Sequence, residues 1–137
     1  MAKVSGSFKG KTNWQATASI PDKGNHDLGV MAIVGRQASP DPNWNNASIT
    51  YWGMADLTDG TGPQRGYFQN AHADGDSDWG SFDGKITTSG QEVTIEGTWR
   101  YTGGTGKFQR ISGSGTYKGR MTSPTEVAAE WAGDYQL

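Results

Sequence analysis

A glycine-rich corner joins two alternating segments in the stretch Trp99-Arg100-Tyr101-Thr102-Gly103-Gly104-Thr105-Gly106-Lys107-Phe108 and its continuation Ser112-Gly113-Ser114-Gly115-Thr116-Tyr117. Before the corner, apolar or small residues take every second position: Val93, Ile95, Gly97, Trp99 and Tyr101. After it, the same period runs through Ile111, Gly113, Gly115 and Tyr117. A period of two predicts strands with one packed and one wet face. The glycines give the backbone the freedom that a sharp reversal needs, so the stretch predicts paired strands in an all-β fold.

The rest of the chain has the same rhythm of short strands and turn signals, which is typical of a sandwich or barrel. No segment shows a helical period, and the best candidate for a short helix is the corner itself, at 104–110. We therefore predict a single domain over 1–137, an antiparallel, mostly up-and-down barrel of about eight strands with a calycin-like architecture. The expected strands are 3–10, 13–20, 28–37, 46–57, 65–74, 79–88, 91–102, 111–121 and 126–136.

The corner also carries a family resemblance. Gly103-Gly104-Thr105-Gly106-x-Phe108 followed by Ser112-Gly113-x-Gly115-x-Tyr117 resembles the corner of the allene oxide cyclase and dirigent superfamily of small barrels, and the match covers residues 99–119. The resemblance implies a cavity that holds an apolar or aromatic metabolite. It also implies a cyclase or isomerase reaction that rests on positioning and water exclusion, without a cofactor.

Composition narrows the classes of partner. The formal net charge is −2, which gives no electrostatic reason to expect nucleic acid or an acidic membrane as a partner. The chain has no cysteine, which excludes disulfides and thiolate metal sites. No stretch has the length of a transmembrane helix and the first residues lack an apolar signal region, so a cytoplasmic protein is expected.

The segment Leu28–Gly35 departs from the alternation, because it is apolar on both faces. Continuous apolarity predicts cover on both sides of a strand. The cover is either a loop of the same chain or a second subunit, and the second option predicts a homodimer or homotrimer.

Five aromatic residues share the apolar parity of their strands and are predicted to point into the barrel: Trp99, Tyr101, Tyr117, Trp131 and Tyr135. Aromatic walls with a few polar handles are typical of ligand pockets. The alternative is that the rings simply fill the core, since eight strands leave an interior only just wide enough for side chains.

Two residues are candidates for the polar handle and for catalysis. Arg36 ends the face that begins at Leu28, and if that face points inward its guanidinium binds a carboxylate or carbonyl oxygen near the barrel mouth. Tyr51 lies on an apolar face, where a buried phenol needs a partner that a ligand can supply. The alternatives are a rim arginine that reaches water and a core tyrosine bonded to a backbone carbonyl.

The remaining polar residues favour structural roles. His26 lies in an expected turn, and His72 is expected on a wet face beside Asn70 and Asp74. The segment 74–80 has the aspartate spacing of a calcium loop, but its glycine follows Trp79 instead of the third aspartate, and Lys85 stands where the final glutamate should be. We therefore expect a hairpin turn and no metal.

A non-catalytic binding module is the competing function, either a lipocalin-like carrier or a sugar-binding protein. A sugar site would use exposed tryptophans beside polar side chains, such as Trp44 near Asn43 and Asn45, or Trp79 beside Asp78. A third possibility is a structural protein with a filled interior.

Overall fold

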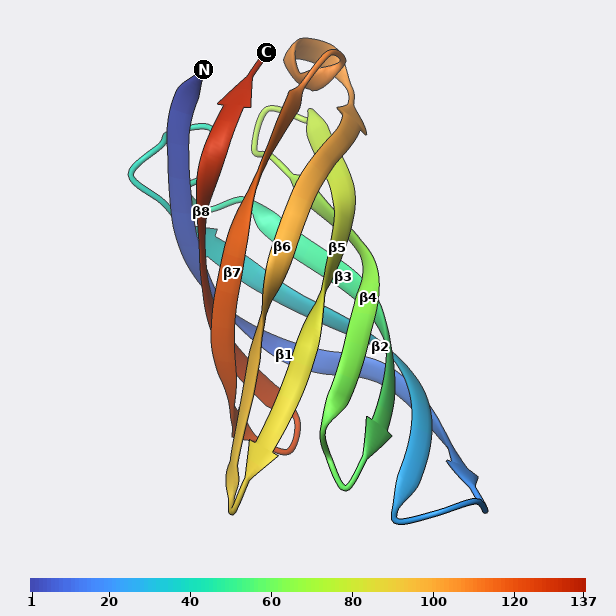
Figure 1. Cartoon of the computed structure of the whole chain (residues 1–137). Coiled ribbons are helices and arrows are strands. Elements are labelled where there is room, and N and C mark those ends of the chain that lie inside the picture. Colours follow the sequence, from blue (N-terminus) through green and yellow to red (C-terminus); the bar gives the residue numbers. More distant parts are fainter.

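The computed structural model describes residues 1–137 as a closed barrel of eight antiparallel strands, each paired with its neighbours in chain order. The predicted all-β, up-and-down barrel is confirmed (Figure 1). Ten residue pairs between the first and last strands close it, among them Val4 with Gly133. The strands are β1 (Ala2–Ile20), β2 (His26–Ala38), β3 (Ser48–Thr58), β4 (Gly62–Ala71), β5 (Ser77–Ser89), β6 (Glu92–Gly104), β7 (Ser112–Ser123) and β8 (Glu126–Gln136).

The first two expected strands are one continuous strand, β1, with a bulge between Thr12 and Trp14. Before the bulge, Phe8 pairs with Gln37, and after it Trp14 pairs with Ala32. The extra residue, Asn13, reverses the parity of the strand. Even-numbered residues therefore face the barrel interior before the bulge and the outside after it.

The two ends of the barrel differ. Four tight hairpins, around residues 21–25, 59–61, 90–91 and 124–125, lie at one end, where β1 and β2 project beyond the other strands (Figure 1). Both termini lie at the opposite end, together with the connections 39–47, 72–76 and 105–111 (Figure 1).

Two of these connections close their end of the barrel. Trp44 from the β2–β3 connection and Phe108 from the corner are both fully buried, and their rings pack 5.6 Å apart between centroids. Trp44 also packs edge-on against Tyr135 at 4.9 Å and stacks against Tyr101 at 5.9 Å. The expectation that Trp44 is an exposed loop tryptophan for sugar binding is therefore wrong. We call Trp44 and Phe108 the aromatic plug.

The glycine-rich corner contains the short helix expected at 104–110, here a single 3-10 turn, η1 (Gly106–Phe108). Gly106 has a φ of +56°, and a Cβ there would lie 2.1 Å from the Asp76 carboxylate. Both facts favour glycine at this position. No helix of the structure has the length and apolarity to cross a membrane.

Candidate functional site: the cavity inside the barrel

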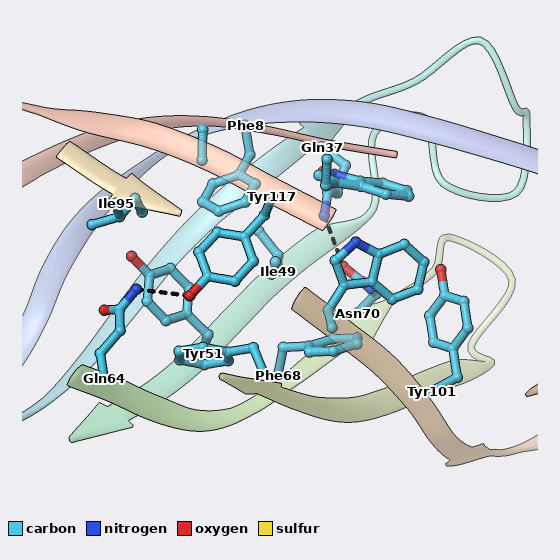
Figure 2. Close-up of a pocket in the computed structure, with 14 residues that line it drawn as sticks. Phe8, Gln37, Ile49, Tyr51, Gln64, Phe68, Asn70, Ile95, Tyr101 and Tyr117 are labelled. Atoms are coloured by element: carbon cyan, nitrogen blue, oxygen red, sulfur yellow. Dashed lines mark hydrogen bonds between the residues drawn. The ribbon is translucent and has the colours of Figure 1, made fainter. Parts of the chain in front are cut away.

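A cavity of about 80 Å³ lies inside the barrel, next to the aromatic plug (Figure 2). Its walls are mainly apolar, and the three amides among them, Gln37, Gln64 and Asn70, are buried. Apolar walls with a few polar groups are the usual composition of a small-molecule site. The lining residues are Phe8, Gln37, Ile49, Tyr51, Gln64, Phe68, Asn70, Phe82, Ile95, Trp99, Tyr101, Tyr117, Ala129 and Trp131.

Most of the predicted aromatic lining lies where the strand parity placed it. Trp99, Tyr101, Tyr117 and Trp131 all line the cavity. Tyr135 is also buried, but it lies behind the cavity beside Trp44, and its hydroxyl donates to Asp41 Oδ2 at 2.9 Å. The structure therefore brings four of the five rings together around one space.

The two residues predicted to bind the polar end of a ligand, Tyr51 and Arg36, lie on opposite sides of the barrel wall. Tyr51 lines the cavity and is only 9% exposed. Arg36 lies on the exposed outer face of β2, where its Nη1 donates to the Asn46 carbonyl at 2.8 Å, so the expected inward position of Arg36 is wrong. The inward residue at this end of β2 is its neighbour Gln37. The sequence did not decide which residues of β2 point inward, because the part of the strand before Arg36 is apolar on both faces.

One group of polar atoms in the cavity is formed by Tyr51, Gln64 and Tyr117, which lie together in Figure 2. Gln64 Nε2 donates to Tyr117 Oη at 2.8 Å. The Tyr117 hydroxyl lies over glycine backbone, since a Cβ at Gly84 or Gly97 would come within 2.7 Å of it. The Tyr51 hydroxyl and Gln64 Oε1 have no hydrogen-bond partner within the protein. No enclosed side-chain polar atom of the structure lacks a partner, so both atoms border the open space of the cavity.

Burial determines the protonation of both phenols. It raises the pKa of Tyr51 well above the usual value, with a further contribution from Tyr117. Burial also raises the pKa of Tyr117, to about 12, against an opposing effect of the Gln64 hydrogen bond. Both hydroxyls therefore keep their protons at physiological pH and are neutral donors.

A second group of polar atoms borders the plug. Gln37 Oε1 accepts from Trp131 Nε1 at 2.8 Å, and Gln37 Nε2 donates to Asn70 Oδ1 at 3.1 Å (Figure 2). Asn70 Nδ2 then donates to Asp78 Oδ1 at 2.9 Å. This chain of hydrogen bonds fixes the orientation of both cavity amides.

Asp78 and His72 end this network behind the cavity wall. Asp78 is fully buried, and its Oδ2 accepts from Trp44 Nε1 at 3.1 Å and from His72 Nε2 at 2.6 Å. His72 Nδ1 contacts the Asn43 carbonyl. Both ring nitrogens face oxygen acceptors, which fixes the orientation of the ring between the Asn43 carbonyl and the Asp78 carboxylate. The expected wet position of His72 is wrong, and the inward parity of Phe68 and Asn70 was the signal for its true one.

Neither the models of known protein families nor the curated proteins match this chain. The resemblance of the corner to allene oxide cyclases and dirigent proteins stays a prediction.

Proposed function

We propose that the protein binds a small, mainly apolar molecule inside the barrel, and that one polar group of this molecule contacts Tyr51 and the Gln64–Tyr117 pair. The observation that carries the proposal is the hydroxyl of the buried residue Tyr51, which lines the cavity and is open to it without a protein partner. A ligand oxygen at this position would accept a hydrogen bond from the Tyr51 hydroxyl, and one such neutral hydrogen bond contributes about 0.5–1.5 kcal/mol.

The size and lining of the cavity support a compact ligand. An apolar cavity of about 150 Å³ holds benzene, and this one measures about 80 Å³. A six-membered ring therefore requires a shift of the half-buried side chains at the wall, such as Phe8, Phe82 or Tyr117. We expect a flat ring or a short branched chain with one oxygen.

A cofactor-free isomerase or cyclase is the second candidate, and it would use the same cavity. It is favoured by the Tyr51 phenol, which lines the cavity and keeps its proton because of its raised pKa, so it would donate a hydrogen bond to a developing oxyanion. The amides of Gln37 and Asn70 would orient the substrate, and catalysis would rest on positioning in a dry site.

A matched pair of probes tests the binding site. Phenol and toluene have nearly the same shape, but only phenol carries a hydroxyl, so we expect calorimetry to show tighter binding of phenol. Tyr51→Phe should remove most of that difference, about ten-fold for one neutral hydrogen bond, and should leave toluene binding unchanged. Arg36→Ala, on the outer face, is the control and should bind both probes as the parent does.

Three outcomes would overturn the proposal. If neither probe binds the parent, the cavity is not a ligand site. If Tyr51→Phe binds phenol as well as the parent does, Tyr51 is not the handle. If Arg36→Ala loses phenol binding as strongly as Tyr51→Phe does, the site lies on the surface.

A further inference from the structure

The outer surface of β1–β4 carries large apolar side chains that nothing in the chain covers. They are at least one-third exposed, from 38% for Val30 to 68% for Tyr67. We define the outer apolar face as Trp14, Leu28, Val30, Val34, Trp52, Met54 and Tyr67.

Strand register makes this face continuous. Trp14 pairs with Ala32, Ala32 with Trp52, and Trp52 with Tyr67, which gives a row across four strands. In the next row, Val30 lies between Ala16 and Met54. Directly paired residues on one face of a sheet lie about 4.5–5.5 Å apart, so these side chains form one patch.

The patch has both projections and a recess. Ala32 is buried and lies between the exposed rings of Trp14 and Trp52. A shallow hollow also opens on the outer surface, and its lining includes Trp14, Trp52 and Tyr67. A surface that pairs with itself about a two-fold axis needs this combination, because each copy supplies a ring and a recess.

The area of the patch matches what a stable dimer buries. With about 150–250 Å² for a large side chain, the seven residues expose on the order of 700 Å². The largest apolar patch of a typical monomer measures about 300–600 Å². A standard interface buries about 800 Å² on each partner. The outer apolar face together with a narrow rim of neighbouring residues therefore has enough area for a stable dimer.

Charges lie only at the border of the patch and have both signs. Lys11 pairs with Val34, Arg65 with Met54, and Asp56 with Leu28. An uncharged centre with a polar rim is the usual anatomy of a protein interface. Because the rim carries both positive and negative side chains, a second copy of the chain can dock without bringing only like charges together.

We propose that two copies of this chain form a dimer through the outer apolar face, with the two-fold axis near Val30 and Trp52. This explains why β2 is apolar on both sides: Ile33 and Met31 serve the barrel interior, and Val30 and Val34 serve the partner. It also selects the dimer among the oligomers that the sequence predicts.

Sedimentation velocity at micromolar concentration tests this surface. We expect the parent to sediment at twice the 14.7 kDa mass of the chain. Val30→Arg and Trp52→Ser should each weaken the dimer at least ten-fold and leave the circular dichroism spectrum unchanged, since both side chains face outward. Trp79→Ser is the matched control. It removes a tryptophan of similar exposure (37% against 45%) outside the patch, and the dimer should persist.

A cross-linking measurement keeps the test independent of folding effects. The chain has no cysteine, so a single Val30→Cys next to the axis should form an intermolecular disulfide under mild oxidation, and Thr116→Cys on the outside of β7 should not. A parent that stays a monomer overturns the proposal, and so does a trimer. A parent dimer that survives both Val30→Arg and Trp52→Ser shows that the interface lies elsewhere and also overturns it.

Discussion

Asp78 is the polar residue on which most of the interior depends. Its two oxygens accept from Asn70, Trp44 and His72, which come from β4, the β2–β3 connection and the β4–β5 connection. One carboxylate therefore links the cavity amides to the plug. Such a residue stabilises only as part of a complete network, because each partner is itself buried.

Asp78→Ala should lower the free energy of unfolding by about 3–5 kcal/mol, since it leaves Asn70, Trp44 and His72 without their buried acceptor, and each unpaired buried group costs about 1–3 kcal/mol. Asp134→Ala is the comparison, because it removes an exposed ion pair with Lys3 at 3.5 Å and should cost about 0–1 kcal/mol. Denaturant unfolding followed by fluorescence measures both. Equal losses for the two variants would contradict the role given to Asp78.

His26 gives the hairpin end of β1 and β2 a dependence on pH. Its Nε2 contacts Asp56 Oδ1 at 2.6 Å and its Nδ1 contacts Asp22 Oδ1 at 2.9 Å. Asp56 and then Asp22 raise the pKa of His26 above its usual value near 6.5. The two contacts of protonated His26 therefore stabilise the folded protein fully below about pH 6.5. This stabilisation is lost as the pH rises through the raised pKa of His26.

Melting temperatures between pH 5 and pH 9 should show this loss in the parent, and His26→Gln should remove that part of the pH dependence. On the acid side, the backbone N–H of Lys23 and then His26 lower the pKa of Asp22. The contribution of Asp22 should therefore persist until the pH falls through that lowered value. A His26→Gln profile identical to that of the parent would exclude His26 as the titrating group.

Residues whose strands alternate could be placed from the sequence, and others could not. Trp99 and Tyr101 alternate with polar residues, so their inward direction followed from parity. Arg36 follows a segment that is apolar on both faces, where two opposite assignments fit equally well. Asp78 and Trp44 are 34 residues apart and meet only because two connections fold over the same end of the barrel, which no local pattern encodes.

At the scale of elements, the β2–β3 connection functions as part of the core. Trp44→Ala should cost about 3–5 kcal/mol of stability, as for other large buried rings. It should also open the plugged end and increase the fluorescence of an added hydrophobic dye. Trp79→Ala, on the outer face of β5, should cost less than Trp44→Ala, because this ring is already 37% exposed, and it should leave dye fluorescence unchanged. If Trp44→Ala lost little stability and left dye fluorescence unchanged, the β2–β3 connection would lie over the end of the barrel without closing it.

The whole molecule is a ring of strands whose ends meet, because Ala2 pairs with Tyr135. A circular permutant that joins the termini with a short linker and opens the β5–β6 hairpin at 90–91 should therefore fold with the parental circular dichroism spectrum. The new break lies at an exposed turn, where chain cuts are tolerated. It should bind the cavity probes as the parent does. An unfolded permutant would show that the β5–β6 turn is needed to start folding.

The closure of β1 against β8 also determines when folding can finish. During synthesis β1 emerges before all other strands of the barrel, and its second neighbour β8 emerges after them. The free edge of β1 therefore stays open until β8 has left the ribosome. Pairing between the two ends of a chain is slow, and open edges expose nascent chains to wrong partners. A stalled chain that lacks β8 should therefore be caught by chaperones and proteases, whereas a chain with all eight strands closes its own edge.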